Sequence, residues 1–340
     1  MATSDFNKPS RIAVLGAGSW GSALAIHLAK QGHEVALWGR NEQVMRAMIE
    51  EGSNARYLPD IAFPSQLTPV VTLDEALLGA DEVLIAVPSH AFYDTLKLVA
   101  AKKPGCMRYV WASKGFEVGT ARLLHQCVEE ILGAQASYAV ISGPTFAKEV
   151  ALGLPTAATL ASNDAAYANE LAALFHGEAF RVYTSDDVAG VELGGAVKNV
   201  FAIAAGISDG LGFGANARAA LITRSLAEMM RLGVALHGQR ETFMGLTGVG
   251  DLLMTCTDNQ SRNRRLGIAL GEGKTIEQAL LEIDQVVEGI QSAKETQTLA
   301  LRLGIDMPIV AQVYAVLHEQ RSAREAVKYL LEREQKPELI

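Results

Sequence analysis

The segment VLGAGSWGSALA, residues 14–25, constrains the fold more than any other part of the chain. It begins in the β-favouring run RIAVLG, passes through Gly16, Gly18 and Gly21, and continues as the helical pattern SALAIHLAKQG. In G-x-G-x-x-G the first glycine permits a tight turn, the second lets a pyrophosphate approach the backbone, and the third lets helix pack on strand. The helix also points its positive end at that anion. The segment predicts a dinucleotide-binding unit; the alternative is a turn with no ligand.

Short β-favouring runs alternate with helical patterns up to about residue 185. The predicted strands are RIAVLG (11–16), EVALWG (34–39), EVLIAVP (82–88), RYVWAS (108–113), YAVISG (138–143), TAATLAS (156–162) and FRVYT (180–184). Several of these runs are apolar throughout, as strands buried on both faces are. The alternation predicts an α/β fold, a doubly wound and mostly parallel sheet with helices on both faces.

After about Ser185 the strand signals stop, and long helical patterns such as VELGGAVKNVFAIAAGISDGL take over. A chain of 340 residues is long enough for two domains. We therefore expect a Rossmann-type domain over residues 1–190 and an all-helical domain over 191–340. An active site between the two halves is expected.

Charge and histidine content exclude some classes of ligand. With 30 basic and 38 acidic side chains the net charge is -8, which offers no general attraction to nucleic acid. Positive charge for an anionic ligand must therefore be local, at helix N-termini and a few Lys and Arg side chains. The seven histidines form no HExxH or other close cluster, so no metal is expected.

Cysteine usage and the apolar runs bear on location. Cys106, Cys127 and Cys256 are far apart and form no CxxC pair, which predicts neither a disulfide framework nor a zinc site. The start, MATSDFNKPSR, lacks the apolar core of a signal peptide, and no later apolar stretch is expected to reach the roughly 18 residues of a spanning helix. These features predict a cytoplasmic protein without a membrane segment.

The second predicted strand ends in LWGRN, where an NAD-specific site usually has Asp or Glu for the ribose. Here Gly39 and then Arg40 follow instead. A guanidinium can pair with the 2′-phosphate of NADP, so we expect NADP or NAD to bind and NADPH to be preferred. The alternative is an exposed loop arginine.

Several further motifs cover the chain from about residue 11 to 320. They are GAGSWG, VPSH (87–90), SKGFE (113–117), SGPTFAKE (142–149), ELGGAVKN (192–199), GVGDLLMTC (248–256), SRNRRLG (261–267) and VVEG (286–289). In this order they resemble the bacterial type of NAD(P)-dependent glycerol-3-phosphate dehydrogenases. The resemblance implies a 6-phosphogluconate dehydrogenase-like fold and interconversion of sn-glycerol 3-phosphate and dihydroxyacetone phosphate. It also implies a homodimer and a supply of glycerol 3-phosphate for phospholipid synthesis.

Reduction of a ketone needs a proton donor for the developing alkoxide, and the reverse reaction needs a base. Lys198 is the candidate, because it lies in a helical pattern almost free of other charges, where desolvation lowers a lysine's pKa. By resemblance it is the family's general acid/base, and Asn199 would orient the substrate or the nicotinamide. The alternative is a lysine whose stem packs on the core while its head reaches water.

Asp251, in GVGDLLMTC, matches the family's active-site aspartate and would hold the ammonium of Lys198. A helix N-cap is the alternative for an aspartate after glycine. Thr255, one helical turn on, shares the face of Asp251 and is expected to hydrogen-bond the substrate.

The sequence SRN provides a hydroxyl, a guanidinium and an amide in consecutive positions, suited to a phosphate. By resemblance, Arg262 lies where substrate phosphate and cofactor meet, and Ser261 and Asn263 contact the substrate. Arg264 and Arg265 are expected on a solvated helix face, as is usual for a run of charges.

Other candidates lie at strand ends, where open α/β sheets bind their ligands. Lys114 follows RYVWAS and, by resemblance, faces substrate and cofactor; the alternative is an exposed loop lysine. Gly143 permits close backbone approach and Thr145 offers a hydroxyl for the substrate.

The remaining cofactor candidates depend more heavily on the resemblance. Ser19 and Trp20 lie in the glycine loop, where the serine can reach the pyrophosphate and the indole can cover the cofactor or pack under the loop. Ala147, Val286 and Glu288 are assigned to the cofactor by resemblance alone.

Two rival functions share some of these features. A β-hydroxyacid dehydrogenase or ketopantoate reductase has the same plan but no need for the SRN and SKG pair. A dinucleotide-binding sensor without chemistry would need no charged lysine in an apolar helix.

Overall fold

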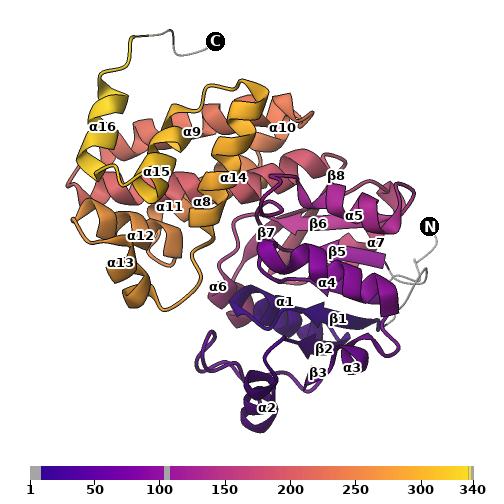
Figure 1. Ribbon diagram of the computed structural model, residues 1–340. Coiled ribbons are helices and arrows are strands. Elements are labelled where there is room, and N and C mark those ends of the chain that lie inside the picture. Colours follow the sequence, from indigo (N-terminus) through magenta and orange to yellow (C-terminus); the bar gives the residue numbers. More distant parts are fainter. Residues whose placement is uncertain (1–8, 103–107, 336, 338–340) are drawn as a thin grey trace.

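An eight-stranded sheet occupies one side of the molecule (Figure 1). The computed structural model describes residues 9–102, 108–335 and 337, so Cys106 and the start of the chain lie outside the described residues. The strands are β1 (Arg11–Leu15), β2 (Glu34–Trp38), β3 (Leu67–Val70), β4 (Glu82–Ile85), β5 (Arg108–Trp111), β6 (Tyr138–Ser142), β7 (Thr156–Ser162) and β8 (Phe180–Ser185). Their order is β3-β2-β1-β4-β5-β6-β7-β8, and of these eight described strands β6 and β7 alone pair antiparallel.

The seven predicted strands are confirmed, and β3 was not predicted. It is four residues long and contains Pro69, which lacks an N–H to donate, and it lies at the edge of the sheet. The chain reverses its direction of winding at β1, which lies between β2 and β4. Ligands of such sheets bind at this switch point, outside the carboxyl ends of the strands.

Helices cover both faces of the sheet, as predicted. They are α1 (Ser19–Lys30), α2 (Glu42–Glu51), α3 (Leu73–Leu77), α4 (Ser89–Lys102), α5 (Leu124–Leu132), α6 (Ala147–Leu152) and α7 (Ala165–Phe175). Alternate residues of β1 point to opposite faces: Val14 packs in one hydrophobic cluster with Leu24 of α1, whereas Leu15 packs in another with Phe92 of α4. The sheet is therefore buried between two apolar layers.

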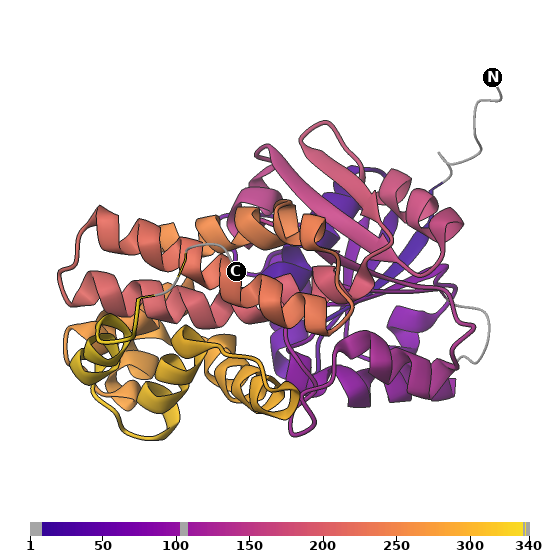
Figure 2. The same ribbon diagram turned by 90° about the horizontal axis from the view of Figure 1, so that it is seen from above.

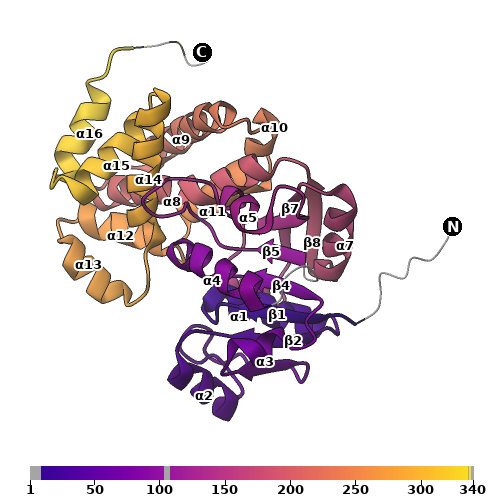
Figure 3. The same ribbon diagram turned by 45° about the vertical axis from the view of Figure 1, so that its right-hand side comes forward.

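The second part of the chain is all helical within the described residues, and Figures 2 and 3 show it beside the sheet. Its elements are α8 (Val188–Gly210), α9 (Ala215–Ala235), α10 (Arg240–Phe243), the π-helical turn η1 (Leu246–Gly250), α11 (Asp251–Thr257), α12 (Arg262–Gly271), α13 (Ile276–Ile283), α14 (Glu288–Leu303), α15 (Pro308–His318) and α16 (Ala323–Leu331). The third hydrophobic cluster surrounds α8, with Val200 and Phe201 fully buried.

Helix α8 corrects one expectation from the sequence. By length and composition it is apolar enough to cross a membrane, with a mean hydropathy of 1.4 over its most apolar window, although no such stretch was expected. In the structure 94% of that window is buried inside the protein. A helix that is apolar all round fits the centre of a helical domain equally well, because its neighbours cover every face.

Glycines bring α8 and α12 into backbone contact. A Cβ at Gly206 of α8 would lie 2.1 Å from the carbonyl oxygen of Arg264, and one at Gly267 of α12 would lie 2.1 Å from that of Ile203. No side chain fits at either position, so the two helices approach more closely than larger residues allow. This contact brings the start of α12 beside the middle of α8.

Candidate active site

A buried lysine and a buried aspartate form the centre of the site. Lys198 of α8 and Asp251, the first residue of α11, form an ion pair, and their side chains are 7% and 0% exposed. The ammonium of Lys198 also donates to Thr255 Oγ1 at 3.0 Å. The Thr255 hydroxyl in turn donates to the backbone oxygen of Asp251 at 2.6 Å. Thr255 therefore shares the face of Asp251, as expected, and Lys198 does not extend to bulk water.

Lys114 joins this pair from the sheet. Its Nζ donates to Asp251 Oδ2 at 2.9 Å and to the carbonyl oxygen of Gly143 at 3.1 Å. The two oxygens of one carboxylate thus bind two ammonium groups. Because Asp251 makes no capping hydrogen bond at the start of α11, the N-cap interpretation is wrong. With a side chain only 12% exposed, Lys114 is not the exposed loop lysine of the alternative.

The segment that carries Lys114 is held by the helical domain. Phe116, Ala121 and Leu123 follow a strand of the sheet but are buried in the hydrophobic cluster around α8. Glu295 of α14 accepts the backbone N–H of Gly119 at 3.0 Å. Lys114 therefore lies on a segment that starts at the sheet and packs against the helical domain.

Burial lowers the pKa of Lys198 to about 8, and the nearby charge of Lys114 acts in the same direction. The carboxylate of Asp251 opposes this shift because it stabilises the ammonium form. A lysine with such a pKa exchanges its proton near neutral pH, which is what a general acid or base requires.

Close packing at Gly194 and Gly195 brings α8 to the sheet. A Cβ at Gly195 would lie 2.8 Å from Ser142 Oγ and 3.5 Å from the side chain of Lys114, and one at Gly194 would lie 2.4 Å from the carbonyl oxygen of Thr247. Glycine inside a helix costs about 1 kcal/mol relative to alanine. Sequence reasoning did not single out this pair, although two consecutive glycines in a helical pattern are a signal for close approach.

Sequence reasoning also missed Glu192, which lies earlier on the same helix. Its buried carboxylate accepts the backbone N–H of His125 at 3.1 Å and pairs with the ring Nδ1 of that histidine. Burial lowers the pKa of His125, but Glu192 outweighs this and the pKa is raised. The pair joins α8 to the N-terminus of α5.

The side chains of Ser261, Arg262 and Asn263 differ in whether they already have hydrogen-bond partners within the protein. Ser261 is the N-cap of α12, accepting the N–H of Arg264 at 3.2 Å. Asn263 donates to Asn199 Oδ1 at 2.9 Å and accepts the N–H of Gly289 at 2.9 Å. The guanidinium of Arg262 makes no hydrogen bond or ion pair with any residue in the described ranges, so it is available to an anion.

The expectation of a solvated face is wrong for Arg264. Its side chain is 8% exposed, pairs with Asp209 of α8, and donates to the carbonyl oxygen of Cys256 at 3.0 Å. Arg265 is half-buried. The close contact of α12 with α8 turns this part of the arginine run inward, which charge patterning along the sequence does not reveal.

The glycine loop has the geometry of a dinucleotide site. Gly16 has a φ of 126°, and a Cβ there would lie 2.5 Å from the carbonyl oxygen of Ala86; a Cβ at Gly21 would lie 1.9 Å from that of Gly16. Packing therefore requires both glycines. At Gly18 a Cβ would meet nothing within 4 Å. Gly18 thus borders open space at the start of α1, which fits the approach of a pyrophosphate.

Around this loop, Arg40 is exposed just after β2, and no ion pair of its guanidinium is found among the described residues. A Cβ at Gly39 would lie 3.0 Å from Ala17 Cβ, so a larger residue would crowd the glycine loop. Ser19 begins α1, and Trp20 packs against the hydrophobic cluster of the sheet domain with its indole nitrogen buried and unpartnered.

The last candidates lie farther along the chain. Ala147 begins α6, and Val286 is 55% exposed before α14. Burial raises the pKa of Glu288, the first residue of α14, and positive charges oppose the rise. Those charges belong to Arg262, Lys114 and Lys198. Glu288 therefore lies within electrostatic range of Lys198 and Lys114, the lysine pair of the site.

Thr145, just after β6, donates its hydroxyl to the carbonyl oxygen of Gly143 at 3.2 Å.

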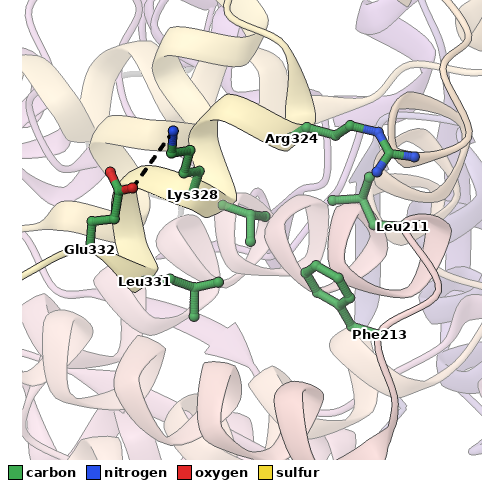
Figure 4. Close-up of a pocket in the computed structure, with 7 residues that line it drawn as sticks. Leu211, Phe213, Arg324, Lys328, Leu331 and Glu332 are labelled. Atoms are coloured by element: carbon green, nitrogen blue, oxygen red, sulfur yellow. Dashed lines mark ion pairs between the residues drawn. The ribbon is translucent and has the colours of Figure 1, made fainter.

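A hollow lies elsewhere, between the end of α8 and α16 (Figure 4). It encloses about 380 Å³ beside Leu211 and Phe213. Its ion pair, Lys328 with Glu332, has side chains 73% and 66% exposed. No charged group there is desolvated as Lys198 is, so we place the chemistry at the lysine pair.

Sequence comparisons agree with this geometry. Residues 11–168 match the family described as NAD-dependent glycerol-3-phosphate dehydrogenase N-terminus, and residues 187–328 match the corresponding C-terminus. A protein of Thioalkalivibrio sulfidiphilus named glycerol-3-phosphate dehydrogenase (NAD(P)+) is 58% identical over 327 residues, 96% of this chain and 98% of that protein. A Haemophilus ducreyi protein of the same name is 55% identical, covering 99% and 100%.

Solved structures agree as well. The crystal structure of glycerol-3-phosphate dehydrogenase from Coxiella burnetii has a TM-score of 0.93 and 48% identity, covering 96% of this chain and 99% of that one. A ketopantoate reductase from Ralstonia eutropha has a TM-score of 0.56 and 17% identity, which is a likeness of fold alone.

Proposed function

The chain belongs to the NAD-dependent glycerol-3-phosphate dehydrogenase family, and on that basis we propose a role for each residue of its site. The enzyme interconverts sn-glycerol 3-phosphate and dihydroxyacetone phosphate with NAD or NADP. When bound, the nicotinamide supplies or accepts the hydride. The chain's own residues bind and orient the two ligands and move the proton.

Lys198 acts as the general acid and base. In the reducing direction its ammonium donates a proton to the oxygen of the substrate ketone; in the oxidising direction the neutral amine takes the hydroxyl proton. Asp251 orients the lysine, and the buried ion pair between them is the observation that supports the proposal most strongly. Lys114 stabilises negative charge on the same oxygen, and Asn199 orients the substrate through its amide nitrogen.

The substrate phosphate binds at the start of α12. Arg262 is the main contact, because its guanidinium has no partner among the described residues and acts on the charge of Glu288 together with Lys114 and Lys198. Ser261, Asn263 and Thr255 hold the surrounding polar groups in place and contact the substrate. Gly143 and Thr145 complete the site from the end of β6.

The cofactor binds across the carboxyl edge of the sheet. Its pyrophosphate lies against Gly18 and Ser19 at the start of α1, between the packed Gly16 and Gly21. Arg40 binds the 2′-phosphate of NADP and makes NADPH the preferred cofactor. We assign the remaining cofactor contacts, toward the nicotinamide, to six residues: Trp20, Lys114, Ala147, Arg262, Val286 and Glu288.

We also propose that the protein is a cytoplasmic homodimer that supplies glycerol 3-phosphate for phospholipid synthesis. Support comes from the family and from the proposed use of NADPH. Sedimentation equilibrium tests the dimer, and accumulation of glycerol 3-phosphate in cells that express the enzyme tests the direction.

The test of the site is the steady-state oxidation of NADPH and NADH with dihydroxyacetone phosphate. Lys198→Ala is expected to lower kcat by at least about 100-fold with cofactor affinity nearly unchanged, the usual scale for a general acid/base. Lys274→Ala is the matched control, because Lys274 pairs with Glu282 at the surface, away from the site. Unchanged turnover of Lys198→Ala would remove its role, and cofactor binding without turnover by the unmodified chain would revive the sensor.

A further inference from the structure

Asn54, in the segment between α2 and β3, reaches back to the glycine loop. It is 1% exposed, and its Nδ2 donates to the carbonyl oxygen of Ala17 at 3.1 Å and to Ser22 Oγ at 2.8 Å. A carbonyl oxygen can only accept, so the amide nitrogen must face Ala17. The amide oxygen Oδ1 then lies on the other side, where it is buried with no partner among the described residues.

The contact with Ala17 sets the direction of one peptide group. In a trans peptide the C=O of one residue and the N–H of the next point in opposite directions. Because Asn54 binds the Ala17 carbonyl, the N–H of Gly18 points away from Asn54. No acceptor in the described part of the chain takes the N–H groups of Gly18, Ser19 or Trp20. The loop therefore holds free donors beside the open space at Gly18.

Asn54 itself has a rigid support. Its backbone oxygen accepts the N–H of Leu58 at 2.8 Å, and Leu58 is 1% exposed in the same hydrophobic cluster as Leu24 of α1. Phe63, at the end of the segment, donates its N–H to the carbonyl oxygen of Gly52 at 2.8 Å. Two backbone bonds and a buried leucine thus hold the amide against the loop, so the contact does not depend on an exposed, unsupported side chain.

We propose that Asn54 is a positioning residue for the dinucleotide: through the carbonyl of Ala17 it keeps the N–H of Gly18 directed at the pyrophosphate. The inference rests on the proposed binding of the cofactor at the glycine loop. Asn54 does not touch the cofactor in this proposal. An amide with an unsatisfied buried oxygen is kept at this place because its nitrogen orients the loop.

The test replaces the donor and keeps the shape. Asn54→Asp places a carboxylate oxygen against the Ala17 carbonyl, so the peptide loses its anchor. Fluorescence titration of the full-length protein should show the Kd of both NADPH and NADH raised about 10-fold, the loss expected for one hydrogen bond. At saturating NADPH, kcat and the KM for dihydroxyacetone phosphate should stay within about 2-fold of the unmodified protein, because the lysine pair is untouched.

Asn163→Asp is the matched control. Asn163 also joins two segments through its amide. It donates to the carbonyl oxygen of Ala136 at 2.8 Å and accepts the N–H of Tyr138 at 2.9 Å, beside the end of β7 and the start of β6. Its Kd for NADPH should not change. If Asn54→Asp is insoluble, Asn54→Ser, which keeps a donor but shortens its reach, is measured in the same way with the same expectation.

Gly18→Val separates this inference from the proposed function. The open space at Gly18 admits a side chain without disturbing the fold, so this variant should lose NADPH binding while it unfolds at an unchanged temperature. If Gly18→Val binds weakly and Asn54→Asp binds normally, the role of Asn54 is wrong. A loss of kcat or substrate affinity in Asn54→Asp equal to the loss of cofactor affinity would also overturn it, because that is the mark of general disruption. If both variants bind NADPH normally, the cofactor placement itself fails.

Discussion

Lys198 and Asp251 form a buried ion pair, and the second oxygen of the same carboxylate binds Lys114. Two ammonium groups thus share one negative charge. The half-buried Glu288 lies within range, but so does Arg262. A chain with a net charge of -8 therefore keeps a local excess of positive charge where an anionic substrate has to bind.

The two directions of the reaction should depend on pH in opposite ways. Burial lowers the pKa of Lys198 to about 8. Reduction needs its ammonium form, so kcat/KM for dihydroxyacetone phosphate should fall as the pH rises through about 8. Oxidation needs the amine, so kcat/KM for glycerol 3-phosphate should rise over the same range. Stopped-flow or steady-state rates between about pH 6 and 10 measure both, and a reduction rate that increases with pH would contradict the assignment.

Asp251→Asn should move the pH profile as well as lower the rate. The carboxylate is the main group that raises the pKa of Lys198 against its burial. Without that charge the pKa should fall further, so the decline of the reducing activity should begin at a lower pH. We expect kcat near neutral pH to drop at least about 10-fold. Asp74→Asn, which removes the charge of a surface pair with Lys102, should leave the pH profile unchanged.

Replacement by alanine should affect substrate binding at Arg262 but stability at Arg264. Arg262→Ala should raise the KM for dihydroxyacetone phosphate about 10- to 100-fold, because a charge-assisted contact to phosphate is lost, with little effect on stability. Arg264→Ala should instead lower the free energy of unfolding by about 3 kcal/mol, since it removes a buried guanidinium that pairs with the partly buried carboxylate of Asp209. Urea unfolding and steady-state kinetics of both variants distinguish the roles. Equal stability losses would refute this division.

Arg40→Ala should change the choice of cofactor. The guanidinium is expected to pair with the 2′-phosphate that only NADP carries, so kcat/KM for NADPH should fall about 10-fold or more while that for NADH stays nearly constant. Arg46→Ala is the matched control, because Arg46 pairs with Glu42 on the surface of α2. Equal losses for the two cofactors in Arg40→Ala would show that the arginine supports the loop and does not read the phosphate.

Local patterns in the sequence were enough to predict much of the fold. The glycine loop, the apolar strand runs and the change to helical periodicity each report on residues close together in the chain. For the same reason they failed at β3, where Pro69 breaks the strand pattern, and in α8, whose apolar length went unrecognised. The site residues were named largely through motifs that match a family.

Periodicity and turn residues act over short range, so the order of residues was sufficient to predict most of the helices and strands, and the family motifs pointed to the residues that carry the chemistry. Three features needed the packed molecule: Asp251 pairs with two lysines, Arg264 is buried while the Arg262 guanidinium has no partner in the described part of the chain, and Asn54 binds the glycine loop. Each of these depends on backbones that pack closely at Gly195, Gly206 or Gly267, or on a side chain that reaches a distant loop. Such contacts join residues far apart in the chain, and a local sequence pattern does not show which distant residue a side chain will contact.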